Sequence, residues 1–274
     1  MKDNHEKILA ALIIATLIFS LFTIFVHSTP GREITISAKA AAVYNPSTDT
    51  FLYSKNENAR LPMASTTKIM TAIVAIEHSE LDKIITVDDR AVGIEGSSIY
   101  LKNGEELSME SLLYALLLRS ANDAAAAIAY EIAGSIEAFS LMMNEKAENL
   151  GLTDTSFENP HGLDAENHYT TAHDLAILSA YAISNPIFKE ICSSKKKIIE
   201  SSMEARLIIN HNKLLNLYEG CIGIKTGYTK KSGRSLASAA EKHGQTLVCV
   251  TINAPDDWND HKKLYDFCFR QLYA

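Results

Sequence analysis

The sequence predicts a mixed α/β (α+β) fold, in which strands from the two ends of the chain form one antiparallel sheet covered by helices from a mostly helical middle. Two observations lead to this prediction. Strand-like segments separated by turn residues lie near both ends of the chain, whereas the segment between them repeats its apolar residues at helical spacing. With 274 residues and 47% hydrophobic composition, the chain can also bury a substantial core.

A hairpin is expected to open the folded part of the chain. Residues 40–44 and 51–53 are rich in strand-forming side chains and flank the turn-forming run Asn45-Pro46-Ser47-Thr48-Asp49. Helices should follow, because apolar residues then recur at every third or fourth position. These helices are predicted at residues 65–78, 109–119, 123–133 and 135–150, with Ser108 capping the second and Gly151 closing the last.

The hydrophobic period changes again toward the C-terminus. Residues 234–240 and 246–252 are predicted as two strands joined by a turn at Lys242-His243-Gly244. A last helix is predicted at about residues 259–272. The sequence contains no internal repeat and no sign of a second folded domain, so residues 34–274 are interpreted as one domain.

The first 33 residues differ in composition from this domain. Residues 8–26 are nineteen uncharged residues, preceded by Lys2 and Lys7 and followed by a polar linker. A helix of that length rises about 1.5 Å per residue and would reach roughly 28 Å, close to the about 30 Å of a bilayer's hydrocarbon core. We therefore expect residues 8–26 to anchor the chain in the cell membrane as a single span, with residues 34–274 outside the cytoplasm.

A cleaved signal peptide is the alternative interpretation of this segment, and it would give a secreted protein. The apolar run is longer than the about 7 to 15 residues usual in signal peptides. Val26-His27-Ser28 is also a poor cleavage site. Both interpretations export the folded domain.

Charge and cysteine content argue against two kinds of site. The net charge of −7 disfavours nucleic-acid binding, which relies on Lys and Arg. The one triple cationic run, Lys195-Lys196-Lys197, is interpreted as a solvated turn. The cysteines show neither a CxxC pair nor zinc-site spacing, so no metal is predicted. Four cysteines allow three disulfide pairings, but buried free thiols are expected at Cys192, Cys221, Cys249 and Cys268.

Ala64-Ser65-Thr66-Thr67-Lys68 contains an S-x-x-K pattern at a predicted helix start. Residues three apart on a helix share a face, so the Ser65 hydroxyl and the Lys68 amine can meet. An alcohol needs a base to become a good nucleophile, and Lys68 can accept the proton only as a neutral amine. Lowering a lysine pKa from about 10.4 to neutrality requires about 4.6 kcal/mol of environmental bias. Burial and a nearby second cation could supply that bias.

Two further triplets complete a constellation. Ser120-Ala121-Asn122 lies at a predicted break between helices, where side chains can project into a cleft. Lys225-Thr226-Gly227 is predicted on an edge strand, where Lys225 would keep its charge and Gly227 would permit close approach of a substrate backbone. Each triplet alone is weak evidence, but S-x-x-K, S-x-N and K-T-G occur in this order, 55 and then 105 residues apart.

The three motifs resemble those of the serine D-alanyl-D-alanine carboxypeptidases, the low-molecular-weight penicillin-binding proteins. The resemblance covers about residues 38–272. It extends to other segments, namely Glu95-Gly96-Ser97-Ser98, Asn159-Pro160-His161-Gly162-Leu163, His168-Tyr169-Thr170-Thr171-Ala172 and Asn210-His211-Asn212-Lys213-Leu214-Leu215. It implies the fold shared by DD-peptidases and serine β-lactamases.

The same resemblance implies a reaction and its residues. Ser65 would form an acyl-enzyme with a peptidoglycan stem pentapeptide and release the terminal D-alanine, with Lys68 as base, Ser120 as proton relay and Asn122 holding the substrate amide. The terminal carboxylate would bind to Lys225 and Thr226. The backbone N–H groups of Ser65 and Tyr228 would stabilise the oxyanion. No cofactor is implied, and β-lactams would acylate Ser65 as covalent inhibitors.

Several alternatives remain open from the sequence. A D,D-endopeptidase would cut cross-links instead of chain ends, and a non-catalytic sensor would be acylated without turnover. A β-lactamase is disfavoured because the E-x-x-L-N signature of class A enzymes is absent near Glu166. A zinc D,D-peptidase is disfavoured because no H-E-x-x-H occurs, and His161 is interpreted as a loop histidine bonded to backbone.

Two positions depart from the family pattern. Ile222 stands where family members often have an acidic residue before the Gly-x-Lys-Thr-Gly segment. His211 stands where some relatives place an arginine that helps to bind the substrate carboxylate. The nucleophile is unaffected by either departure.

Overall fold

The computed structural model describes residues 34–273. Within the chain, Ile36–Ala274 form one compact unit. The predicted anchor or signal segment, residues 8–26, lies outside the described residues.

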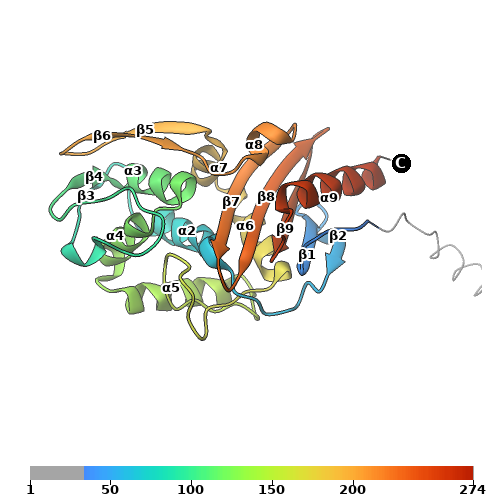
Figure 1. Cartoon of the computed structure of the whole chain (residues 1–274), viewed down its shortest axis with the longest axis horizontal. Coiled ribbons are helices and arrows are strands. Elements are labelled where there is room, and N and C mark those ends of the chain that lie inside the picture. The colour runs from blue at the N-terminus through green and yellow to red at the C-terminus, as the bar shows by residue number, and fades with distance from the viewer. Residues whose placement is uncertain (1–33, 274) are drawn as a thin grey trace, which may run out of the picture. The chain divides into compact units, whose positions relative to one another are not determined.

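A five-stranded antiparallel sheet forms the centre of this unit, in the order β2-β1-β9-β8-β7 (Figure 1). Strands from the two ends of the chain meet where β1 pairs with β9 and Val43 lies opposite Cys249. β7 forms one edge of the sheet. The strands are β1 (Ala40–Asn45), β2 (Thr50–Lys55), β7 (Cys221–Thr229), β8 (Gly233–Lys242) and β9 (Gln245–Ile252).

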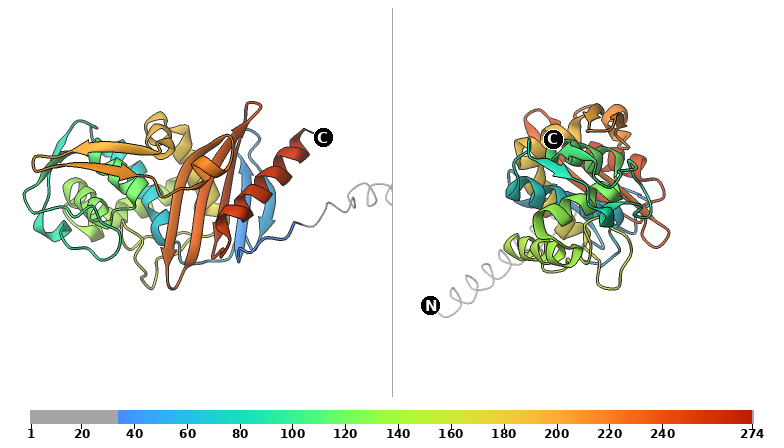
Figure 2. Two further views of the ribbon diagram at one scale, coloured as in Figure 1. Left: turned by 45° about the horizontal axis from the view of Figure 1, so that its top comes forward. Right: turned by 90° about the vertical axis from the view of Figure 1, so that its left-hand side faces the viewer.

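Helices cover both faces of this sheet. α9 packs on one face against β8 and β9, and α6 packs on the other against β1 and β9 (Figures 1 and 2). α2 runs through the helical part, where Ile69, Met70 and Ile73 are fully buried. The helices are α2 (Lys68–His78), α3 (Met109–Tyr114), α4 (Asn122–Ala133), α5 (Ile136–Asn149), α6 (Ala172–Ser184), α7 (Pro186–Ser193), α8 (Leu214–Leu217) and α9 (Asp257–Leu272), with a short 3₁₀ helix η2 (Asp89–Ala91).

The predicted α+β fold is confirmed, with irregular turns at two helix ends. The predicted helix 65–78 begins as a 3₁₀ turn, η1 (Ala64–Thr67), that continues into α2. The predicted helix 109–119 is α3 followed by a π-helical turn, η3 (Ala115–Arg119). It ends at Ser120, whose φ of 65° is left-handed, so Ser120 does lie at a break between helices.

Two small ribbons were not predicted. β3 (Ile84–Thr86) pairs with β4 (Glu106–Ser108), and β5 (Lys196–Glu200) pairs with β6 (Ala205–Ile209). The interpretation of the Lys195-Lys196-Lys197 run as a solvated turn was therefore wrong for its last two residues. These residues pack on α3 as part of a strand, and the Lys197 amine lies over the Tyr114 ring, 4.4 Å from its centroid.

All four cysteines are free thiols, as expected, with Cys192, Cys249 and Cys268 buried and Cys221 partly buried. In the described part of the chain, no single helix is long and apolar enough to span a membrane. α4 and α5 meet the length and composition requirement only when taken together, across an 85° bend.

Candidate active site

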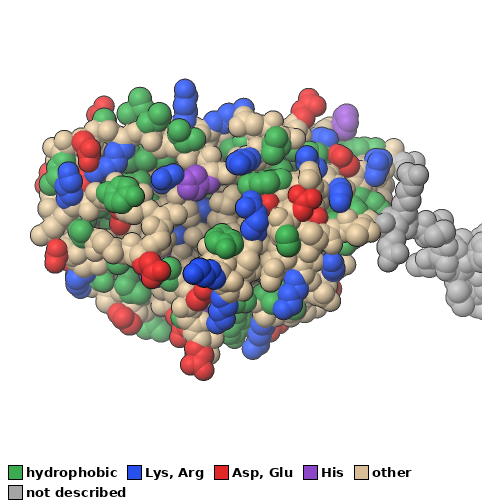
Figure 3. All heavy atoms as spheres, in the orientation of Figure 1, with side chains coloured by type: hydrophobic (Ala, Val, Ile, Leu, Met, Phe, Trp, Pro, Cys, Tyr) green, Lys and Arg blue, Asp and Glu red, His purple; other side chains and the backbone are tan. Residues whose placement is uncertain are grey.

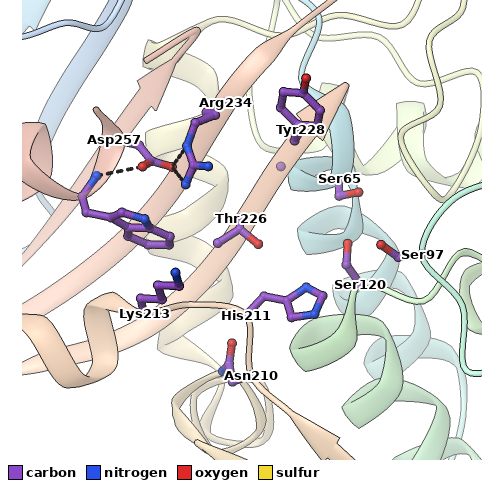
Figure 4. A pocket seen from close by; sticks show the side chains of 12 residues that line it. Ser65, Ser97, Ser120, Asn210, His211, Lys213, Thr226, Tyr228, Arg234 and Asp257 are labelled. Carbon is purple, nitrogen blue, oxygen red and sulfur yellow. Dashed lines mark hydrogen bonds and ion pairs between the residues drawn. The ribbon is translucent and has the colours of Figure 1, made fainter. Parts of the chain in front are cut away.

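Ser65 lies in η1, immediately before α2, and is partly exposed. The residue before it, Ala64, has a left-handed φ of 49°, a conformation that costs free energy for any residue with a Cβ. Such a turn presents the following side chain away from the helix. The Ser65 hydroxyl therefore faces a cavity instead of the core (Figure 4).

Lys68 is the second residue of the predicted pair, and it is fully buried at the start of α2. Its Nζ lies 3.1 Å from Ser65 Oγ and 2.7 Å from Asn122 Oδ1. It also donates to the backbone carbonyl of His161. The sequence-predicted contact between Ser65 and Lys68 is present in the structure.

The surroundings of Lys68 favour its neutral form. Burial lowers the pKa of the Lys68 amine well below its usual value, and the positive charge of Lys225 lowers it further. The carboxylate of Asp123 opposes these effects. A neutral amine at this position can accept the hydroxyl proton of Ser65.

The partners of Lys68 also orient its lone pair. A neutral amine has two N–H groups and one lone pair, whereas the Asn122 amide oxygen and the His161 carbonyl can only accept. Both N–H groups of Lys68 are thus directed to these two acceptors. The lone pair is left for the third neighbour, the O–H group of Ser65.

The loop around His161 is itself tied to the backbone. The ring nitrogen Nδ1 of His161 accepts from the N–H of Leu163 at 3.3 Å, and burial lowers the pKa of His161 to about 3. The interpretation of His161 as a loop histidine bonded to backbone is confirmed. Its contribution to the site is its carbonyl oxygen.

Ser120 and Asn122 come from the break between η3 and α4, but they face different surroundings. The side chain of Ser120 lines the cavity close to Ser65 (Figure 4). The Asn122 amide instead donates to the carbonyl of Glu95 at 2.5 Å, and Asn122 is only 4% exposed. In this structure Asn122 positions Lys68 and uses one of its two amide N–H groups for Glu95, and its expected contact with a substrate amide stays a prediction.

Lys225 lies on β7 behind the cavity wall and is 1% exposed. Its amine donates to the carbonyl of Thr226 at 2.9 Å. Burial lowers the pKa of Lys225 to about 7, so this side chain titrates near neutrality. The expected positive charge of Lys225 is therefore present below about pH 7 and lost above it, because burial lowers this pKa and no carboxylate among residues 34–273 offsets the effect.

Two glycines let separate segments close around the nucleophile. A Cβ on Gly227 would lie 3.2 Å from Met63 O and from Ser65 N, and a Cβ on Gly162 would overlap the carbonyl oxygen of Ala64. Gly162 also has a φ of 89°. The close approach that Gly227 permits is therefore to the turn carrying Ser65, and not only to a substrate backbone.

The cavity beside Ser65 has a volume of about 480 Å³. Lys and Arg side chains and a histidine gather near the centre of this face (Figure 3). Five of the predicted site residues line this cavity, namely Ser65, Ser120, Thr226, Gly227 and Tyr228. The remaining lining residues were not among the predicted site residues, namely Ser97, Asn210, His211, Lys213, Arg234, Asp257 and Trp258.

Arg234 is held against the cavity by Asp257. Its Nε and Nη2 lie 3.1 and 3.0 Å from Asp257 Oδ2, and the other carboxylate oxygen accepts from the Trp258 N–H. The guanidinium lies over the Trp258 ring, 5.7 Å from its centroid. Arg234 pairs across the sheet with Tyr228, which a sequence pattern could have revealed only if the register were known.

His211 carries a fixed pattern of donors. Arg119 Nη1 donates to His211 Nε2 at 2.9 Å, so the remaining ring nitrogen of neutral His211 bears the proton. Burial, with the charges of Lys225 and Arg119, lowers the pKa of His211 to about 4. His211 is thus a neutral N–H donor in the wall of the cavity.

No group of three or more His, Cys, Asp or Glu residues within residues 34–273 could hold a metal ion. The site instead combines a serine, a neutralised lysine and several cations beyond them. Such an arrangement can perform nucleophilic acyl transfer on a substrate with a negatively charged end.

Comparisons with known proteins agree with this chemistry. The model of peptidase family S11, D-alanyl-D-alanine carboxypeptidase, matches residues 26–256. The D-alanyl-D-alanine carboxypeptidase DacF of Bacillus subtilis is 32% identical over 278 residues, which cover 97% of this chain and 72% of the relative.

Solved structures are similar as well. A crystal structure of a D-alanyl-D-alanine carboxypeptidase from Mycobacterium tuberculosis H37Rv has a TM-score of 0.83 at 31% identity, covering 88% of this chain and 95% of that one. A point mutant of the Streptomyces K15 DD-transpeptidase also has a TM-score of 0.83, at 30% identity, covering 87% and 100%. Both similarities extend over the whole fold, not the motifs alone.

Proposed function

The chain belongs to the D-alanyl-D-alanine carboxypeptidase family, peptidase family S11, and on that premise we propose that Ser65 is its nucleophile. It is a serine DD-peptidase of the penicillin-binding type that acts in peptidoglycan metabolism. The proposed reaction removes the terminal D-alanine from a stem pentapeptide. The observation that carries the assignment is the buried Lys68 amine, 3.1 Å from Ser65 Oγ.

Acylation begins with proton transfer from the Ser65 hydroxyl to the neutral amine of Lys68. The Ser65 oxygen then forms a bond to the carbonyl carbon between the two D-alanines. When the C–N bond breaks, the leaving amine takes up a proton from Lys68 through the hydroxyl of Ser120, which lines the cavity beside Ser65. Free D-alanine and an ester on Ser65 result.

Deacylation repeats the sequence with water as the nucleophile. Lys68, neutral again, takes a proton from water as the water oxygen attacks the ester carbonyl. The Ser65 oxygen leaves with that proton, and the shortened peptide is released. The backbone N–H groups of Ser65 and Tyr228 are the proposed oxyanion donors, and Tyr228 lies on the edge strand β7, whose outer side has no strand partner in the sheet.

The basic side chains and neutral hydrogen-bond donors in and behind the cavity wall are the proposed binding site for the terminal carboxylate. Lys225 and Thr226 were expected in this role, and the cavity adds His211, Lys213 and Arg234. Arg234 retains one terminal nitrogen, Nη1, that Asp257 does not engage. A β-lactam with its carboxylate is expected to occupy the same place and to acylate Ser65.

The location of the reaction is also a proposal. We place the catalytic domain outside the cytoplasm, attached to the cell membrane through residues 8–26, because that segment is uncharged over nineteen residues. Cleavage of the segment would release the same domain in secreted form.

Mass spectrometry of the full chain treated with labelled penicillin tests the nucleophile. A single adduct on Ser65 is expected, and it should be absent from a Ser65→Ala variant. An adduct on any other residue would overturn the assignment, and the mass of the mature N-terminus would show whether the leader is cleaved.

Product analysis tests the reaction type. Incubation with a stem pentapeptide should release free D-alanine at a higher rate than a cross-linked dimer is cut. Cleavage of the cross-linked dimer, without release of D-alanine from the pentapeptide, would instead favour a D,D-endopeptidase. A long-lived adduct without any turnover would favour the sensor.

A further inference from the structure

The ribbon formed by β5 and β6 carries apolar side chains on its solvent-facing side. Ile198, Leu207 and Ile209 are 62%, 58% and 58% exposed. Ile198 pairs with Leu207 and Lys196 pairs with Ile209, so these side chains share one face. Hydrophobic and basic side chains are visible along the upper edge of Figure 3, where Figure 1 places the ribbon. A two-stranded ribbon normally presents polar residues to water, so three exposed apolar side chains gathered on one face make this face a candidate contact surface.

The other face of the ribbon is already packed. Ile199 and Ile208 are each 3% exposed. Arg206 forms an ion pair with the fully buried Glu105, and the Ser202 N–H donates to the carbonyl of Glu106. The ribbon is therefore fixed to its own domain and cannot turn over to bury its outer side chains.

Two opposite charges flank the centre of the outer face. Lys196 and Glu200 are both exposed, and each lies two residues from Ile198 on the same side of β5. Neither makes an ion pair with any residue in the range 34–273. Reversing the direction of β5 about Ile198 exchanges the positions of these two charges.

From this arrangement we propose that the outer face of the ribbon binds a second copy of the chain across a twofold axis near Ile198. The axis sets the two β5 strands antiparallel, so that Lys196 faces the partner's Glu200 and Glu200 faces the partner's Lys196. Ile198 and Leu207 form the apolar centre. An interface of this kind is isologous, and it is self-complementary in both charge and shape.

Lipid is the less suitable occupant. Anionic headgroups attract basic segments, whereas Glu200 at the end of the apolar strip would be repelled from the same surface. A surface that pairs with both Lys196 and Glu200 must carry a negative and a positive charge at the same spacing. A second copy of this ribbon provides that surface.

The size of the ribbon sets the strength of the association. Five-residue strands are roughly 17 Å long, and two of them make a face roughly 10 Å wide, far smaller than the about 800 Å² per partner of a standard stable interface. The dimer is therefore reversible and depends on protein concentration. Because Asn210 and His211 follow β6 directly and line the cavity, the interface lies next to the active site.

Sedimentation equilibrium of the full chain, in a detergent matched to the density of the solvent, tests the interface. From low to high micromolar concentration, the average mass should rise from that of one 30.1 kDa chain toward twice that value. Ile198→Glu should remain a monomer throughout. Leu141→Glu is the matched control, because Leu141 is 71% exposed on α5, outside the ribbon, and this variant should associate like the parent.

A charge exchange tests the twofold geometry. Lys196→Glu should weaken association by about tenfold, because it places two carboxylates opposite each other twice. Adding Glu200→Lys to it should restore self-association, whereas this double variant should not associate with the parent chain. Thermal unfolding confirms that each variant is folded. A parent chain that stays monomeric, an Ile198→Glu variant that associates normally, or a double variant without restored association would overturn the proposal.

Discussion

The reactivity of Ser65 depends on how the Lys68 amine distributes its hydrogen bonds. Asn122 and the His161 carbonyl take its two N–H groups, and burial makes the uncharged form accessible. The same amine would become an ammonium donor if it were protonated, and its third N–H would then point at Ser65. Only the neutral state is a base, so the rate should follow the protonation of this one group.

A Lys68→Arg substitution separates charge from basicity. Arginine keeps a cation and several N–H donors but cannot lose its proton. Acylation of Ser65 by labelled penicillin is expected to slow by about 10² to 10⁴, the usual contribution of a general base. The rate is measured by quenched-flow mass spectrometry. Acylation at the parent rate would show that Lys68 acts only through its charge.

The pH dependence of acylation should report Lys225. Burial lowers its pKa to about 7, so the side chain is positively charged below that pH and neutral above it. Attraction of an anionic β-lactam should therefore decline as the pH rises through about 7. On the acid side the rate should fall when Lys68 becomes protonated. The profile of the second-order acylation rate should be bell-shaped.

Lys225→Arg is the matched variant for this profile. Its guanidinium stays charged throughout the accessible range, so the alkaline decline should disappear while the acid limb remains. An alkaline limb that is unchanged in the variant would assign it to a different group.

Arg234 should contribute to recognition of the substrate carboxylate without affecting the nucleophile. Removing it alone would leave Asp257 buried without its partner, so the informative variant is Arg234→Gln with Asp257→Asn. KM for a stem pentapeptide should rise about tenfold or more with a smaller change in kcat. Steady-state kinetics on the pentapeptide decide this. An unchanged KM would remove Arg234 from the binding site.

Residue identities at the site were largely predictable, but their surroundings were not. Ser65, Lys68, Ser120 and Lys225 could be found from spacing, because a catalytic motif constrains residue type at short range. Arg234 and Asp257 meet only through the register of β7, β8 and the start of α9, which no local pattern encodes. The engagement of Asn122 with Glu95 likewise depends on a loop packed from elsewhere.

At the scale of elements, the site is an assembly of four segments around the turn η1. The loop through Gly162 approaches this turn from one side, and β7 approaches it through Gly227 from another. Ser120 follows the π-helical turn η3, and Asn122 begins α4. Two close backbone approaches therefore fix the turn that carries Ser65: a methyl group has no space at Gly162, and at Gly227 it would be tight.

Gly162→Ala should displace the turn that carries Ser65. The added Cβ would overlap the carbonyl oxygen of Ala64, so one segment must move. We expect a loss of about 1–3 kcal/mol of stability from overpacking, in addition to about 1 kcal/mol of backbone strain, and slower acylation. Denaturant unfolding and the acylation rate are the measurements.

Gly151→Ala is the control for backbone strain. Gly151 has a similar left-handed φ of 71°, but a Cβ there would have no atom within 4 Å. This variant should lose only about 1 kcal/mol of stability and keep the parent acylation rate. If the two variants behaved alike, the contact with Ala64 would not matter to the site.

The elements that were predicted well from the sequence have a regular spacing of apolar residues and are bounded by turn or cap residues. Residues 40–44, the helix of α2 and the last two strands are bounded by turn or cap residues, and each was predicted within a few positions. The ribbon β5–β6 was missed because its strands are apolar on both faces, so Ile198 and Ile199 show no alternation. Helix α6 was missed too, although Thr171 caps it and Asp174 lies in its first turn.

For the whole molecule, closure of the fold depends on contacts between the two ends of the domain. β1 pairs with β9, and just before β1 the backbone N–H groups of Ser37 and Ala38 donate to Asp260 at the start of α9. The hydroxyl of Ser37 donates to the same carboxylate at 2.7 Å. Asp260 is only 1% exposed, so these few residues satisfy a buried charge.

A chain beginning at residue 34 should therefore fold and react like the full chain, because Ile36–Ala274 contain the whole core and every residue of the proposed site. A chain beginning at residue 39 should lose about 3–5 kcal/mol of stability, since the Asp260 carboxylate then loses its three donors and the buried side chains of Ile36 and Ala38 are gone. Thermal unfolding and labelled-penicillin acylation of the two truncated chains, beside the full one, measure both effects. A second change, Asp260→Asn in the shorter chain, should recover part of the lost stability by removing the unpaired charge. Equal stability of the two truncated chains would show that closure of the domain does not depend on these contacts.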